Sequence, residues 1–248
     1  MKEQEHLDLY YKDILTQTNL SDFKDLDRLS APFLLKVYDS YLNSDKKIMF
    51  VGKETNHWLT HSSRDEDKKG LKYLINNYEE AYQTLIKRYE KALIDNSQNN
   101  KSAFFSEYKY IQKELGMEEL GNIVWNNLFK LAYDQNKGFS KNSKTHLDVV
   151  ALSKKIFLKE LKILKPDILI FVTGSSYDKS IKNTLKEYET IDVHITKRLW
   201  KFKYKDIICY RTIHPHYYRL NHKKENNNYY NLIAEDIKQN NSGKMNVL

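Results

Sequence analysis

A short apolar run with no polar interruption constrains the fold more than any other feature of this 248-residue sequence. Residues 167–174 (Asp-Ile-Leu-Ile-Phe-Val-Thr-Gly) follow Pro166 and end at a glycine. A strand with one wet face alternates apolar and polar residues, so this run predicts a strand buried on both faces. Such strands occur in parallel sheets that helices cover on both sides. The sequence therefore predicts an α/β protein.

Amphipathic segments alternate with the apolar runs along the chain. Residues 71–94 and 147–164 carry apolar side chains at positions i, i+3, i+4 and i+7, which predicts two long helices. The second stops before Pro166, as a helix does ahead of proline. Further helices are expected over residues 5–18, 29–43, 104–115, 176–188 and 225–238, and further strands over residues 47–51, 193–199, 204–212 and the apolar start of 121–130.

Strand–helix alternation of this kind predicts a three-layer α/β/α fold around a central, mostly parallel, four-stranded sheet. We expect one domain over residues 1–248, with N-terminal helices in residues 1–45 and a helical insertion at 59–120 between the first two strands. The sequence contains neither a dinucleotide-binding fingerprint nor a Walker motif, which argues against phosphate binding by a glycine-rich loop.

Composition excludes several classes of protein. The single cysteine, Cys209, rules out an intramolecular disulfide framework, a four-cysteine zinc site and an iron–sulfur cluster. No apolar run reaches the roughly 18–20 residues of a membrane helix, and the N-terminus shows no secretory signal, so we expect a cytoplasmic protein without a membrane partner. A formal charge of +8 is compatible with a polyanionic partner, and equally with a merely lysine-rich composition.

Polar side chains follow three of the predicted strands. Glu54 comes after the first, Asn126 and Asn127 after the second, and His214 after the last. Because the carboxyl ends of parallel strands share one edge of a sheet, these groups are candidates for a common site. An amide can read the edge of a base, an imidazole can hydrogen-bond a leaving group, and a carboxylate can orient water or stabilise a cationic sugar. Cleavage of an N-glycosidic bond needs these three functions.

At these residues the sequence resembles the uracil-DNA glycosylase superfamily. Residues 52–56 (Gly-Lys-Glu-Thr-Asn) are similar to its first motif, residues 127–130 (Asn-Leu-Phe-Lys) to the segment with its base-reading asparagine, and residues 214–217 (His-Pro-His-Tyr) to its His-Pro motif. The likeness covers residues 47–220, and the single cysteine places the chain outside the iron–sulfur branches. It implies a DNA glycosylase that flips a nucleotide into a pocket, with Glu54 and His214 as catalytic residues.

The resemblance also implies binding residues. Asn127 is favoured over Asn126 for reading the base, because Lys130 follows it at the family's spacing. Asn56 stands where one branch has a tyrosine that excludes a C5 methyl group, so a 5-modified pyrimidine is an alternative to uracil. Thr55 replaces the family proline. The substrate-binding set is Gly52, Lys53, Thr55, Asn56, Trp58, Asn126 and Asn127, and the DNA-binding set is Lys130, Tyr217, Tyr218, Arg219 and Lys223.

Two other functions use the same residues. A catalytically silent nucleic-acid-binding module would keep the basic surface without releasing a base. A hydrolase or transferase of free nucleosides or nucleotides would use the same carboxylate, amide and imidazole without preferring a polymer. The sequence favours the glycosylase, acting as a monomer on single- or double-stranded DNA in base-excision repair or anti-phage defence, with neither a metal nor another cofactor.

Overall fold

The structure, a computed structural model, describes residues 2–23, 26, 29–54, 58, 70–98, 102–133, 146–221 and 228–242. The chain packs as two compact units. The first consists of Met1–Tyr38, Gly52–Ala92 and Trp125–Lys165, and the second of Asp39–Val51, Leu93–Val124 and Pro166–Leu248. No helix in the described ranges is both long and apolar enough to span a bilayer.

A six-stranded mixed sheet confirms the α/β class and has two strands more than the four predicted. Its order is β2-β1-β3-β6-β5-β4. Strands β1, β3 and β6 run parallel, with Val51, Phe171 and Arg211 in register at their carboxyl ends. A hairpin of β4 and β5 adds antiparallel strands beyond β6. The strands are β1 Ile48–Gly52, β2 Ile123–Asn127, β3 Ile168–Phe171, β4 Tyr188–Ile195, β5 Leu199–Tyr204 and β6 Ile207–Arg211.

The helices mostly follow the predicted periodicity. α6 spans Leu147–Leu164, as predicted, and ends where Lys165 adopts a left-handed conformation before Pro166. The helix predicted at 71–94 is divided into α3 and α4, and α8 was not predicted. The other helices in the described chain are α1 Lys2–Thr16, α2 Asp39–Leu42, α3 Gly70–Asn76, α4 Tyr78–Gln98, α5 Ala103–Leu115, α7 Asp178–Thr184, α8 Pro215–Asn221 and α9 Tyr229–Ser242, with 3-10 turns at Leu20–Asp22 and Ser175–Tyr177.

The helix predicted over residues 29–43 is wrong except for α2 at its end. Residues 30–38 carry no helix, and nearly all of them are buried without a helical period. Their backbone bonds instead to the chain after β2, with Ser30 N–H donating to Ala132 O at 2.9 Å and Phe33 N–H to Lys130 O at 2.7 Å. Pro32 disfavours helical geometry in the residue before it, which favours this extended path.

The core of the first unit is built on α1, α6 and a cluster of aromatic rings. α1 packs against α6 and α3. The ring of Phe33 lies 5.1 Å from Trp58, 5.5 Å from Tyr89 and 4.6 Å from Trp125, between centroids. The extended segment therefore delivers a central core residue that a helix at this position would place differently.

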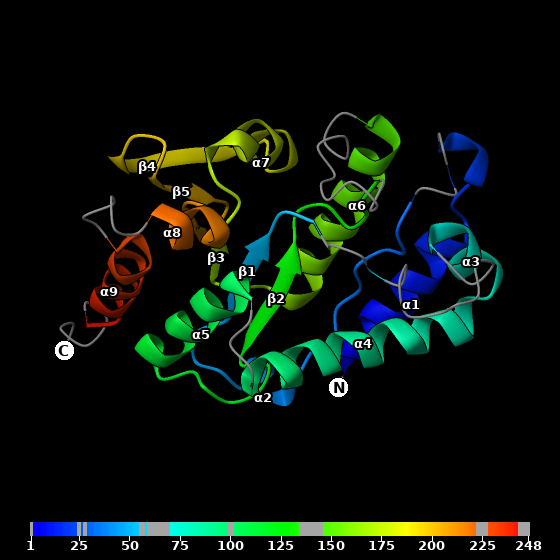
Figure 1. Cartoon of the computed structure of the whole chain (residues 1–248), viewed down its shortest axis with the longest axis horizontal. Coiled ribbons are helices and arrows are strands. Elements are labelled where there is room, and N and C mark those ends of the chain that lie inside the picture. Colours follow the sequence, from blue (N-terminus) through cyan, green and yellow to red (C-terminus); the bar gives the residue numbers. More distant parts are fainter. Residues whose placement is uncertain are drawn as a thin grey trace. The chain divides into compact units, whose positions relative to one another are not determined.

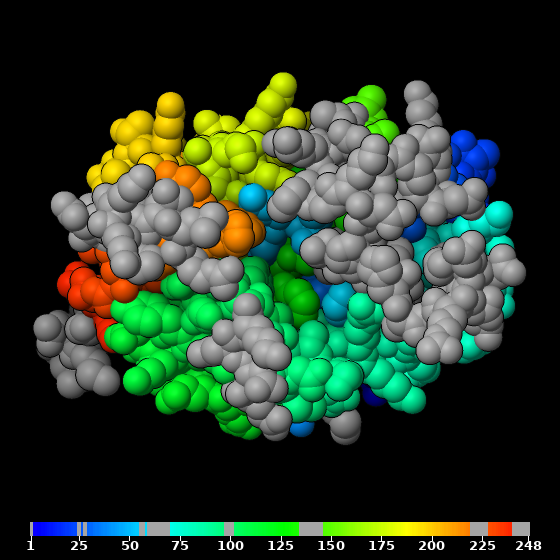
Figure 2. All heavy atoms as spheres, viewed as in Figure 1, coloured from blue at the N-terminus to red at the C-terminus, as the bar shows by residue number. Residues whose placement is uncertain are grey.

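The second unit covers its strands with helices from distant parts of the sequence. α5 packs against α8 and α9, and Figure 2 shows the side chains of α5 (green) next to those of α9 (red). Phe50 of β1 meets Phe104 and Tyr108 of α5 at 5.2 and 5.7 Å. The β4–β5 hairpin, yellow in Figure 1, continues the sheet past β6.

Candidate functional site

In the first unit, the chain after β1 runs beside the chain after β2. The carbonyl of Gly52 accepts a hydrogen bond from Leu128 N–H at 3.0 Å, and that of Lys53 accepts one from Phe129 N–H at 2.8 Å. Glu54 is the next residue, and its side chain is half-buried. The structure thus brings Glu54 and Asn127 onto adjacent backbone segments, as the sequence predicted for the first two strand ends.

Trp58 lies in the aromatic cluster of this unit. Its indole packs edge-on against Trp125 at 6.0 Å, and the guanidinium of Arg88 lies 5.2 Å from its ring centre. Burial lowers the pKa of Arg88. The predicted binding residues Thr55 and Asn56, which precede Trp58, lie outside the described residues.

Asn127 is the last residue of β2 and carries a buried amide with an unused donor. Its side chain is on the same strand face as Trp125, because residues two apart on a strand point the same way. Asn127 is 2% exposed, and its Nδ2 meets no acceptor within the described chain. Leaving such a donor unsatisfied costs about 1–3 kcal/mol. A buried donor of this kind calls for an explanation, and a ligand acceptor provides one.

Asn126 points to the opposite face of β2, and both its Nδ2 and its Oδ1 bond to protein groups. Its Nδ2 donates to Glu160 Oε2 at 2.9 Å, and its Oδ1 accepts from the backbone N–H of Asn127 at 2.7 Å and from Lys130 Nζ. These bonds use the carbonyl oxygen and one N–H of the Asn126 amide, which favours Asn127 over Asn126 as the residue that reads the base.

The surroundings of Lys130 do not fit its predicted role at the DNA backbone. Its side chain is 0% exposed, and its ammonium pairs with Glu160 Oε2 at 2.5 Å. Burial lowers the pKa of Lys130, an effect that the nearby Glu160 carboxylate opposes. A fully buried ammonium cannot contact a phosphate group of DNA.

His214 belongs to the second unit and follows the end of β6. Its Nδ1 accepts a hydrogen bond from His216 N–H at 3.2 Å, so the neutral imidazole carries its proton on Nε2. Pro215 begins α8, a position that suits proline because the first helical N–H needs no partner. Ile213, the residue before His214, is held by Tyr230 of α9, whose hydroxyl donates to Ile213 O at 2.8 Å.

The predicted DNA-contact residues after His214 differ in their surroundings. Tyr217 is 41% exposed, and the guanidinium of Arg198 in the β4–β5 turn lies 5.2 Å from its ring centre. Tyr218 instead packs on Tyr230 at 5.6 Å, so Tyr217 is the better candidate for contact with DNA bases. The side chain of Arg219 and the whole of Lys223 lie outside the described residues.

Glu107 on α5 gives the second unit a pH-sensitive carboxyl. Burial raises the pKa of Glu107 from 4.5 to about 7. Burial, and after it the charge of Glu107, raises the pKa of Tyr230 well above its ordinary value. A carboxyl whose folded pKa exceeds its unfolded pKa favours folding only while it is protonated. The contribution of Glu107 to stability is therefore complete below pH 4.5 and is lost as the pH rises through about 7.

We therefore expect Glu107→Gln to stabilise the protein at pH 8 by about 1–2 kcal/mol, after allowance for solvent screening of a partly exposed group. At pH 5 the variant and the natural protein should be nearly equal. Urea unfolding at the two pH values measures the difference. Glu119→Gln, which changes an exposed carboxyl, is the control and should show no such gain. Equal pH dependence in both variants would contradict the prediction.

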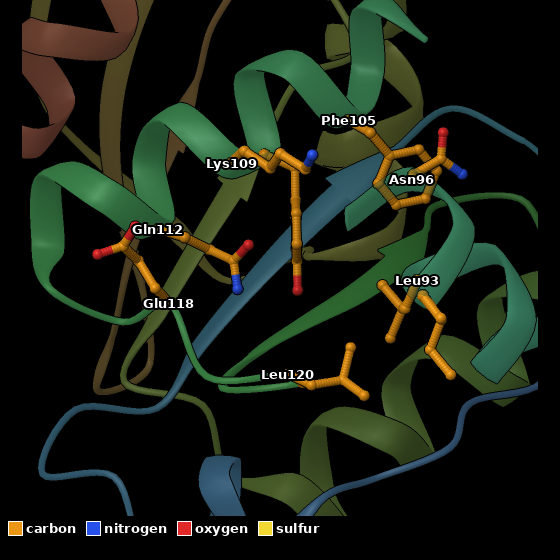
Figure 3. Close-up of a pocket in the computed structure, with 10 residues that line it drawn as sticks. Leu93, Asn96, Phe105, Lys109, Gln112, Glu118 and Leu120 are labelled. Carbon is orange, nitrogen blue, oxygen red and sulfur yellow. The ribbon is translucent and has the colours of Figure 1, made fainter. Parts of the chain in front are cut away.

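A separate cavity of about 320 Å³ lies in the second unit (Figure 3). Leu93, Phe105 and Leu120 give it apolar walls, while Lys109 and Glu118 are among its polar lining. The amide of Gln112 is engaged, since its Nε2 donates to Met117 O at 3.1 Å. None of the predicted site residues lines this cavity.

Sequence reasoning missed the partners of Asn126 and Lys130. Glu160 lies on the buried face of α6 together with Phe157 and Leu164, and Tyr11 lies on the buried face of α1. A carboxylate within the apolar stripe of a predicted helix was the signal available for Glu160, because buried charges are almost always paired.

No cluster of three or more histidine, cysteine, aspartate or glutamate side chains suited to a metal ion occurs among the described residues. Comparison of the sequence with models of known protein families gives no match, and comparison with curated proteins gives none either.

Proposed function

We propose that this protein is a DNA glycosylase that hydrolyses the bond between a flipped-out pyrimidine and its deoxyribose. The observation that carries the proposal is the buried Nδ2 of Asn127, which has no acceptor within the described chain. A pyrimidine offers a carbonyl oxygen to such a donor, and its ring suits a site beside aromatic side chains.

The reaction breaks the bond from C1′ to N1, and its electron pair passes to the base. Water adds to C1′ and loses a proton, and the base anion takes up one proton, so the products are the neutral free base and an abasic sugar. Glu54 is proposed to orient that water or to stabilise the cationic sugar of the transition state. His214, with its proton on Nε2, is proposed to donate a hydrogen bond to the departing base.

The remaining assignments are part of the proposal. Gly52, Lys53, Thr55 and Trp58 bind the base together with Asn127, while Asn56 determines which C5 substituent enters. Tyr217 contacts the DNA strand, for which the +8 charge gives electrostatic attraction. The substrate is uracil or a 5-modified pyrimidine, such as hydroxymethylated or glucosylated cytosine. The fold is proposed to be a three-layer α/β/α arrangement.

A substrate panel tests this function. Duplex and single-stranded DNA with uracil, 5-hydroxymethylcytosine or glucosylated 5-hydroxymethylcytosine, and the free nucleosides, are incubated with the protein and then treated with alkali or analysed for released base. We expect alkali-labile sites in at least one DNA. Asn127→Ala should lower that rate about 100-fold, because a buried hydrogen bond to the base is lost. Absence of abasic sites in every DNA, or equal cleavage of free nucleosides, would contradict the proposal.

A further inference from the structure

Four fully buried polar side chains form one network in the first unit. Tyr11 donates to Glu160 Oε1 at 2.7 Å, and Lys130 pairs with Glu160 Oε2 at 2.5 Å. Asn126 Nδ2 also donates to Oε2, at 2.9 Å, while Asn126 Oδ1 accepts from Lys130. The network joins α1, the end of β2, the loop after it and α6, and each polar side-chain atom in it has at least one partner.

Stability is a poor explanation for this ion pair. Removing two charges from water carries a large desolvation cost, and well-packed apolar side chains of similar volume are often as stabilising or more so. The two charges here are enclosed completely. A fully buried charge pair is better explained by directional hydrogen bonding, which apolar side chains cannot provide.

The ion pair can fix the orientation of an amide. A carboxylate accepts hydrogen bonds and an ammonium only donates them, so Glu160 requires the Nδ2 side of Asn126 and Lys130 requires its Oδ1 side. With the amide held this way round, Oδ1 also faces the backbone N–H of Asn127 and accepts from it at 2.7 Å. The reverse orientation would present an NH₂ group to that N–H and break the bond.

We propose that Lys130 and Glu160 are positioning residues that orient Asn126 and thereby hold Asn127 in place to read the base. The assignment of Asn127 to the base rests on the proposed function. The positioning itself rests on the bonds among Lys130, Glu160 and Asn126 and on the bond from Asn127 N–H to Asn126 Oδ1. The Tyr11 hydroxyl donates to Oε1 of Glu160, the oxygen that does not bond to Asn126 or Lys130, and accepts from Leu35 N–H, so it contributes little to the position of Asn127.

Amide hydrogen exchange tests the positioning without any assay of activity. In Lys130→Met/Glu160→Leu, which removes both charges together, we expect the Asn127 amide to exchange at least about tenfold faster, as loss of a buried hydrogen bond implies. Amides of β3 in the other unit should be unchanged. Tyr11→Phe is the matched control and should leave the Asn127 amide at its natural rate.

Single-turnover base release from the active substrate of the panel provides the second measurement. We expect the double variant to lose about 100-fold in rate with DNA affinity unchanged, since small displacements of a binding group cost this much. Asn126→Ala keeps the ion pair, removes the acceptor for Asn127, and should behave in the same way; it decides the question if the double variant does not fold.

If the Asn127 amide exchanges at the rate of the natural protein in both the folded double variant and Asn126→Ala, the proposed positioning is overturned. Faster exchange with no base release from any substrate, even by the natural protein, would support the positioning and overturn the proposed function. Faster exchange with an unchanged release rate would overturn the link between Asn127 and the base.

Discussion

Replacing Glu54 with glutamine is expected to abolish most base release while leaving the protein folded. Glutamine keeps the shape of the side chain but removes the negative charge proposed to stabilise the cationic sugar and orient water. Loss of one such group costs about 100- to 1,000-fold in rate. Because Glu54 is half-buried in a loop after β1, the melting temperature should change little.

Single-turnover rates and DNA binding, measured together, check this expectation. Glu54→Gln should bind substrate DNA at least as tightly as the natural protein, since a carboxylate near the backbone is repelled by phosphate. Asp45→Asn, which changes an exposed carboxylate just before β1, should release base at the natural rate. A Glu54→Gln protein with full activity would show that Glu54 has no catalytic role.

Lys130→Met is expected to destabilise the first unit by about 3–5 kcal/mol, because it leaves Glu160 buried without its cation. Urea unfolding with a probe in that unit measures the loss. The exposed pair of Lys12 and Glu79, at 2.6 Å, provides the control, and Lys12→Met should cost less than about 1 kcal/mol.

Adding Glu160→Leu to Lys130→Met should recover most of the lost stability, because no unpaired charge then remains in the core. This recovery separates the ion pair's effect on stability from its effect on Asn127. A Lys130→Met protein as stable as the natural one would contradict the account of the buried pair.

Local periodicity made α6 and β3 predictable. α6 has a complete apolar stripe and a proline just after its end, so its bounds followed from the sequence. The burial of β3 on both faces likewise follows from its unbroken apolar run. In these segments local preference and tertiary packing agree, which makes a pattern reliable.

The remaining features depend on contacts between distant segments. Residues 30–38 contain apolar residues at helical spacing, yet they bond to residues 130–132, which no local pattern reveals. Lys130 resembled a surface lysine because its partner Glu160 is 30 residues away and on another element. Adjacent residues on a strand face opposite sides. Which of Asn126 and Asn127 has an amide donor left for a base therefore depends on what packs on each side of β2, and the sequence does not show this.

Hydrolysis in ¹⁸O-labelled water, followed by mass spectrometry of both products, tests the central claim most directly. We expect free pyrimidine and abasic DNA in equal amounts, with one ¹⁸O atom at C1′ of the sugar and none in the base, and a rate that depends on Glu54 and Asn127. Intact DNA after incubation with stoichiometric protein, for uracil and for each 5-modified pyrimidine, would contradict it.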